Sequence, residues 1–152
     1  MSEAQAGPPA VTRVLSRLPP FVGSRVINRA LRWSGIRVGR TANFWGPPTF
    51  RGDPRRYLTI GEACGFNIGC VFELDDEITF EDHVSVGHEV LFRGQRPIRI
   101  GTGAWLGARV IVEPGVTIGP GAVIGAGTVV REDVPANLMI SGTRKVSLAK
   151  WR

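Results

Sequence analysis

The chain has two histidines, which are the side chains best suited to moving protons near neutral pH. His83 lies in EDHVSVG and His88 lies in SVGHEV, five residues later. A neutral imidazole can act as a general base, and the adjacent Glu89 could orient that of His88. Zinc needs about three or four ligands, and there is no third histidine. We therefore expect no metal site, and we interpret His88 as the candidate base, with a turn histidine bonded to backbone as the alternative. We interpret His83 as structural.

Charged residues gather in three further segments, RGDPRR, ELDDE and RGQR. Arg93 and Arg96 of the last segment could bind an anionic acceptor. Asp75 and Asp76 of the acidic segment could act as a base or hold a cation. We favour charge pairing between the segments, although exposed pairs contribute little stability each, and these two binding roles are the alternative.

The composition is that of one folded domain of 152 residues, with 43% hydrophobic residues, 20 glycines and 11 prolines. The net charge is +6, but the arginines are spread along the chain and no nucleic-acid-binding motif accompanies them. We expect no nucleic-acid partner. Two cysteines are too few for a disulfide scaffold, so Cys64 and Cys70 should lie in the core of a cytoplasmic protein. No apolar run reaches the ~18 residues of a membrane span, so we expect no membrane partner.

An apolar repeat every six residues provides the framework for these side chains. A second register of small or apolar residues runs two positions earlier. This pattern is the hexapeptide repeat of a parallel β-helix, in which each unit is a short strand with two inward residues. A glycine follows four of the six repeat positions, and we expect it to provide positive φ in the turn. The repeat positions are Ile100, Leu106, Val112, Ile118, Ile124 and Val130.

The same registers extend back to Ile36 when short insertions are allowed, which predicts fifteen units in about five coils. Each insertion follows the third unit of a coil, at Phe50, Phe72 and Phe92. All three inserted loops should therefore lie at one corner of the helix. The three charged segments fall in these loops, so they should stack on one another.

The predicted organisation is an all-β domain with a helical cap. Residues 1–12 are expected to be disordered, 13–35 to form the cap, 36–134 the β-helix and 135–152 a closing segment. An amphipathic α-helix is predicted over 21–34. Its apolar residues should cover the open end of the first coil; they are Val22, Val26, Ile27, Ala30, Leu31 and Trp33.

The residue between the two inward positions of each unit points outward, so it reports what each face contacts. One face carries mainly threonines, which suit water, and a second carries Gly65, Ser85, Trp105 and Val123. The third face is an apolar ladder, which predicts an interface with another copy or a covering by the chain's own tail. The apolar ladder consists of Val71, Leu91, Ile111 and Val129.

The run PIRIGTGAWLGARVIVEPGVTIGPGAVIGAGTVVREDVP resembles the hexapeptide-repeat acetyltransferases, a family that includes the maltose and galactoside O-acetyltransferases. The resemblance implies a left-handed coil and a homotrimer with ligand sites between subunits. It implies acetyl-CoA or another acyl-CoA as co-substrate. The expected reaction is transfer to a hydroxyl or amine of a small molecule, such as a sugar or a natural product.

The resemblance also implies roles for particular residues. Trp105, Gly107, Ala108, Gly125 and Ala126 would line the groove for the pantetheine arm. Arg131, Arg144, Lys145 and Lys150 would be candidates for contacts with the CoA phosphates.

Two features depart from the family pattern. Glu132 stands where a lysine is common, and the loop before PIRIG lacks the family's histidine. His88 would then supply the base. The alternative function is a catalytically silent or repurposed β-helix trimer that binds a ligand or partner.

Overall fold

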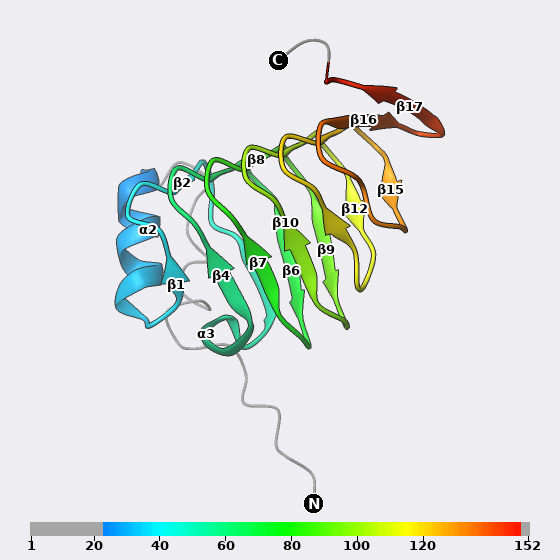
Figure 1. The fold of residues 1–152 in the computed structure, drawn as a ribbon. Helices are drawn as coiled ribbons and strands as arrows, with labels where there is room; N and C mark the ends of the chain where they lie inside the picture. The colour runs from blue at the N-terminus through cyan, green and yellow to red at the C-terminus, as the bar shows by residue number, and fades with distance from the viewer. Residues whose placement is uncertain (1–22, 150–152) are drawn as a thin grey trace, which may run out of the picture.

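The computed structural model describes residues 23–149 and shows a parallel β-helix with one α-helix at its N-terminal end (Figure 1). The helix is left-handed, as the resemblance implied, and it has about five coils. The predictions of disorder for residues 1–12, of a cap over its first residues and of a role for Lys150 concern residues outside the described range.

Three parallel sheets form the faces of the β-helix, because each coil contributes one strand to each sheet. Sheet A contains β1 (Arg37–Val38), β4 (Leu58–Ile60), β7 (Ile78–Phe80), β10 (Ile98–Ile100) and β13 (Thr117–Ile118). Sheet B contains β2 (Asn43–Phe44), β5 (Gly65–Phe66), β8 (Ser85–Val86), β11 (Trp105–Leu106), β14 (Val123–Ile124), β16 (Leu138–Ser141) and β17 (Arg144–Ser147). Sheet C contains β3 (Thr49–Gly52), β6 (Val71–Leu74), β9 (Leu91–Gly94), β12 (Ile111–Val112) and β15 (Val129–Val130).

The predicted register is confirmed. All thirty inward positions from Ile36 to Val130 are buried, and the apolar ladder runs in register along sheet C. Phenylalanines fill the first three coils, where the rings of Phe72 and Phe92 stack at 5.2 Å between centroids. Both cysteines are free and buried, and burial raises the pKa of Cys70 to about 11.

The glycines that follow the inward aliphatic residues do not provide the expected positive φ. Gly107 does not have a positive φ. The residue with positive φ in this turn is Arg109, two positions later, with 56°. A Cβ on Gly107 would lie only 2.6 Å from the backbone nitrogen of Ala126 in the next coil. Adjacent coils are only ~4.8 Å apart, so glycine at this position allows the backbones to stack.

The N-terminal cap is α2 (Ser24–Trp33), which covers the first coil (Figure 1). Ile27 and Leu31 are fully buried, as expected. The prediction was wrong for Val26 and Trp33, which are 57% and 90% exposed because they lie on the opposite side of the helix. The buried side of α2 also includes a polar residue, Asn28. Its amide donates to the carbonyl of Ala42 at 2.8 Å, which has no earlier coil to pair with, and to that of Gly39 at 2.9 Å, which also accepts from the N–H of Ala42.

The insertions lie at the single corner between sheets C and A, as predicted, and the first of them forms α3 (Pro54–Tyr57). The segment after Val130 begins a further coil, since Val134 bridges to Ile118 and β16 adds to sheet B beside β14. The chain then reverses, and β17 pairs antiparallel with β16. Among residues 23–149 no helix is long and apolar enough to cross a bilayer.

Candidate active site

A strip of small residues follows the corner between sheets B and C in the last two full coils. Gly107 donates its N–H to the carbonyl of Ile124 at 2.7 Å, which stacks it under Gly125. Ala108 and Ala126 occupy the next position in the same two coils. Beside them the Trp105 side chain stands on sheet B and is 57% exposed. The structure thus brings together all five residues expected to contact the pantetheine arm.

His88 lies at the same corner, one coil before Ala108. Its carbonyl accepts from the N–H of Arg109 at 2.9 Å, and the residue is exposed. Within residues 23–149 no hydrogen bond to its imidazole is formed. The Glu89 carboxylate is bonded to Nε of Arg109 at 2.6 Å rather than to His88. That hydrogen bond and the charge of Arg109 lower the pKa of Glu89.

His83 lies at a different corner, between sheets A and B. It has a φ of 60°, and its N–H donates to the carbonyl of Glu62 at 2.8 Å. Among the described residues no group of three or more histidine, cysteine, aspartate or glutamate side chains is arranged to hold a metal.

The basic residues near the C-terminus are not gathered at one place. Arg144 is opposite Ser141 in the antiparallel ladder of β16 and β17, and Ser141 lies directly over Gly125. Arg144 is therefore at the end of the strip. Lys145 points the other way from β17 and forms an ion pair with Glu132 at 2.8 Å. Arg131 follows β15 on sheet C, at the far end of that strand from the strip. Arg144 is therefore the best placed of the three for a phosphate.

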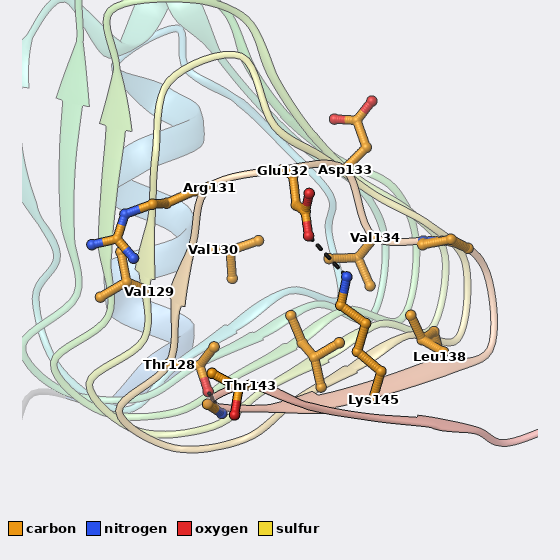
Figure 2. A pocket seen from close by; sticks show the side chains of 13 residues that line it. Thr128, Val129, Val130, Arg131, Glu132, Asp133, Val134, Leu138, Thr143 and Lys145 are labelled. Atoms are coloured by element: carbon orange, nitrogen blue, oxygen red, sulfur yellow. Dashed lines mark hydrogen bonds and ion pairs between the residues drawn. The ribbon is translucent and has the colours of Figure 1, made fainter.

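The Lys145–Glu132 pair spans a cavity of about 520 Å³ at the C-terminal end of the β-helix (Figure 2). Its floor includes Val130 and Ile140, which are the last inward side chains of the core. Arg131 points away from the ion pair (Figure 2). The cavity is thus the uncovered end of the core and is separate from the strip.

The charged loops lie at the corner between sheets C and A. Glu73 is 2.8 Å from Arg51 and 3.7 Å from Arg93, and Arg93 also reaches Glu113 at 3.2 Å. These contacts are the charge pairing that was favoured over ligand binding.

Two of the loop residues predicted to bind an acceptor are held by backbone groups. Arg96 donates to the carbonyl of Pro114 at 2.9 Å, and Asp76 accepts from the N–H of Glu77 at 2.7 Å. Asp75 is exposed at the same corner. Strand β9 separates these loops from His88, so one chain does not bring the two sets together.

Comparison with known proteins identifies a family model and a curated protein that match part of the chain. The family model described as bacterial transferase hexapeptide (six repeats) matches residues 97–132. Over 60 residues the chain is 45% identical to galactoside O-acetyltransferase from Escherichia coli strain K12, a match that covers 38% of this chain and 30% of that protein.

The chain is also similar to solved structures over most of its length. A maltose O-acetyltransferase from Clostridium difficile 630 has a TM-score of 0.76 and 27% identity, covering 90% of this chain and 80% of the other. A hexapeptide-repeat acetyltransferase from Vibrio cholerae has a TM-score of 0.76 and 25% identity, covering 91% and 86%. That acetyltransferase in complex with acetyl coenzyme A, from the O1 biovar eltor, gives 0.67 and 26%, covering 90% and 85%. This chain resembles the hexapeptide-repeat acetyltransferases. The resemblance seen in the sequence is therefore confirmed.

In this hexapeptide-repeat protein, sequence reasoning missed two exposed apolar residues at the start of the same corner. Trp45 is 58% exposed and Ile68 is 45% exposed, in the first and second coils. Trp45 follows an inward phenylalanine, in the position that Gly107 and Gly125 take in later coils. An aromatic residue where the repeat prefers a small one was the available signal.

Proposed function

We propose that the protein is a CoA-dependent acyltransferase that transfers an acetyl group to a hydroxyl or amine of a small molecule such as a sugar. The observation that carries this proposal is the exposed Trp105 side chain beside the strip of Gly107, Ala108, Gly125 and Ala126. Small side chains leave the backbone amides accessible to a pantetheine arm. Similarity to an acetyltransferase solved in complex with acetyl coenzyme A supports acetyl-CoA as the co-substrate.

The ends of the strip give the co-substrate a direction. Arg144 lies over the last coil, where its guanidinium can pair with a CoA phosphate. Lys145 could contact the phosphate as well only if it broke its 2.8 Å ion pair with Glu132. With the phosphates at this end, the thioester lies toward the third coil and His88.

His88 then acts as the general base. Its neutral imidazole takes the proton of the acceptor hydroxyl while the oxygen attacks the thioester carbonyl. The new C–O bond forms, the C–S bond breaks, and the proton passes from the imidazolium to the departing thiolate, which leaves as CoA thiol. Most of the remaining acceleration comes from holding the two substrates in contact.

The assembly that we propose is a homotrimer packed through the apolar ladder on sheet C. Its four side chains are half-buried within the single chain. In a threefold assembly the contact is heterologous, which means that two different surfaces meet. The edge of sheet C at the corner with sheet B would therefore meet, in the next copy, the edge at the corner with sheet A. His88 of one copy would then face the loop of Arg93 and Arg96 in the next, and the acceptor would bind between them with Asp75 and Asp76 nearby. The cytoplasmic location stays a prediction.

Titration calorimetry with acetyl-CoA tests the proposal directly. We expect saturable binding below millimolar concentration, and loss of that binding in Trp105→Ala. His88→Ala should bind acetyl-CoA normally and lose about 100-fold in turnover. His83→Ala should keep both the binding and the turnover of the wild type. Absence of binding at millimolar acetyl-CoA would sink the acyltransferase proposal.

A second function, a catalytically silent β-helix, is favoured by the short loop after β9. Only Gln95, Arg96 and Pro97 separate β9 from β10, and none is a histidine. Binding of acetyl-CoA without transfer to any sugar or amine tested would support this alternative.

A further inference from the structure

We propose that the outer side of α2 docks on the surface of an anionic lipid bilayer, with the arginines of the helix at the lipid phosphates and Trp33 among the head groups. This interaction goes beyond acyl transfer and does not depend on it. It needs no segment that spans the bilayer. It therefore replaces the expectation of no membrane partner, which considered only spanning segments.

The helix α2 has one side in the core and the other in solvent. Its buried residues are Ile27, Asn28 and Leu31, which face the first coil. With 3.6 residues per turn, the exposed residues lie on a single arc of roughly 120° on the opposite side. The arginines occupy one half of this arc, and the two apolar residues occupy the other half. The exposed residues are Arg25, Val26, Arg29, Arg32 and Trp33.

The arginines of α2 have little charge compensation within the chain. The side chains of Arg25 and Arg29 make no ion pair in residues 23–149. Arg32 interacts electrostatically with the carboxylate of Glu62. That carboxylate is not bonded to Arg32, and it already accepts three hydrogen bonds from the first coil. All three guanidinium groups are therefore available to an external anion.

The positive charge of the protein is concentrated at this end of the β-helix. Arginines occur along the whole chain, but acidic residues do not. Residues 23–57, which form α2, the first coil and α3, contain eight arginines and one acidic residue, Asp53. Residues 58–149 contain seven basic and eleven acidic residues.

The basic surface extends beyond the helix itself. A Cβ on Gly35 would lie 3.8 Å from Cδ of Arg55, so this arginine of α3 reaches the turn that follows α2. Both helices lie at the N-terminal end of the β-helix (Figure 1). Unbalanced charge over such an area produces a positive field that attracts an anionic surface.

The apolar half of the arc favours a bilayer over other polyanions. Trp33 is 90% exposed and Val26 is 57% exposed. Tryptophan is enriched at membrane interfaces, where its ring lies at the level of the head groups. Arginines are attracted to the negative potential of an anionic leaflet. A nucleic acid would neutralise the arginines but would offer Val26 no apolar layer. A bilayer offers both, with phosphates outside and acyl chains behind them.

The proposed homotrimer would strengthen this contact. Packing through sheet C around a threefold axis along the stack of coils places all three copies of α2 at the same end. Three helices that meet one surface together bind with an avidity far above the affinity of one. A modest contribution from each arginine is therefore sufficient for stable docking.

Co-sedimentation with vesicles tests the proposal on the full chain. We expect binding to vesicles of equal parts phosphatidylglycerol and phosphatidylcholine, little binding to phosphatidylcholine alone, and weaker binding at high salt. Arg25→Gln with Arg29→Gln should weaken binding at least about 25-fold, since each arginine near an anionic surface contributes about 5-fold. Arg25→Lys with Arg29→Lys should retain most of the binding. Arg99→Gln with Arg131→Gln removes the same charge from later coils and is the matched control, which should change binding little.

The apolar half of the arc is tested by Trp33→Ala. This variant should weaken vesicle binding about 10-fold, because a large apolar side chain leaves the interface. Trp105→Ala removes an exposed indole from sheet B instead and should not change vesicle binding. Circular dichroism should show the same fold in all variants, and the α2 variants should keep the acetyl-CoA Kd of the wild type.

Three results would overturn the docking surface. The first is a wild-type protein that does not bind the anionic vesicles at low salt. The second is an equal loss in the glutamine variant of α2 and in its control, which would show a general effect of net charge. The third is unchanged vesicle binding by Trp33→Ala together with tighter binding of a single-stranded RNA of about 30 nucleotides, which would make this end a nucleic-acid surface. Failure to bind acetyl-CoA would instead overturn the proposed function and leave the docking surface in place.

Discussion

The carboxylate of Glu62 in the second coil accepts two hydrogen bonds from Thr41 in the first coil, from the hydroxyl at 2.6 Å and from the backbone N–H at 3.0 Å. It also accepts from the N–H of Arg40 at 3.1 Å. These hydrogen bonds favour the charged form and lower the pKa of Glu62 to about 2. One exposed carboxylate thus adds three hydrogen bonds to the backbone ladders that join the first coil to the second.

This carboxylate should make the stability of the folded chain depend on pH. The pKa is lower in the folded chain than its ordinary value of 4.5, so the contribution is present above pH 4.5 and is lost as pH falls toward 2. We expect Glu62→Gln to lower the Tm at pH 7. The difference from wild type should shrink as the pH is lowered through this range, because wild-type Glu62 also becomes neutral.

Thermal unfolding followed by circular dichroism from pH 7 to pH 3 measures this effect. Glu77→Gln is the matched control, since the Glu77 side chain is exposed and makes no hydrogen bond within the described part of the chain. A Tm difference for Glu62→Gln that stayed constant over the whole range would show that the carboxylate charge is not responsible.

The close stacking of coils predicts a second effect. Gly107→Ala would place a methyl group 2.6 Å from the backbone nitrogen of Ala126, which cannot move without disturbing the next coil. We expect a loss of about 1–3 kcal/mol, as for other overpacked sites, measured by urea unfolding. Gly23→Ala is the control, because a Cβ there meets nothing within 4 Å. Equal losses in both variants would mean that chain flexibility, not the coil contact, is being measured.

The apolar ladder predicts the assembly. Leu91→Asp combined with Ile111→Asp places two carboxylates next to each other on sheet C, where the residues pair in register. Burying these charges between copies would be costly, so we expect monomers by light scattering. Thr117→Asp on sheet A should leave the mass of the assembly, measured in the same way, unchanged. A trimer that persisted with both sheet C substitutions would locate the subunit contact on another face.

The β-helix itself could be predicted in detail because one period determines both strand position and side-chain direction. Once Ile100 and Ile118 are aligned, each insertion must fall at a corner, and the charge pairing of Arg51, Glu73 and Arg93 follows. The role of Gly107 could not be predicted this way. A six-residue repeat shows that a small residue recurs, but it does not distinguish a turn conformation from a close contact between coils.

The candidate site was only partly predictable for a related reason. Trp105, Gly107 and Gly125 share a corner because they share a register, so the sequence alone brings them together. The distance of Arg93 from His88 depends on which corner each occupies, and that requires the whole coil. Trp45 was missed because the place of its indole depends on Gly65 in the next coil, twenty residues later in the chain.

The end of the β-helix provides the last prediction, since a coil at the end of a stack has carbonyls without a partner strand. The Asn28 amide satisfies that of Ala42 at 2.8 Å and is a second donor to that of Gly39 at 2.9 Å, and the residue is 5% exposed. Asn28→Ala should cost about 1–3 kcal/mol because the buried carbonyl of Ala42 would lose its donor. Arg29→Ala, one position along on the exposed side, should cost little.

Asn28→Leu separates hydrogen bonding from packing volume, since leucine fills a similar space but cannot donate. We expect it to unfold in urea at the same reduced concentration as Asn28→Ala. Hydrogen exchange should show the first coil opening before the rest in both variants, because later coils still pair with neighbours on each side. Stability restored by leucine would show that α2 stabilises the end of the β-helix by apolar contact alone, and that the two carbonyls find water instead.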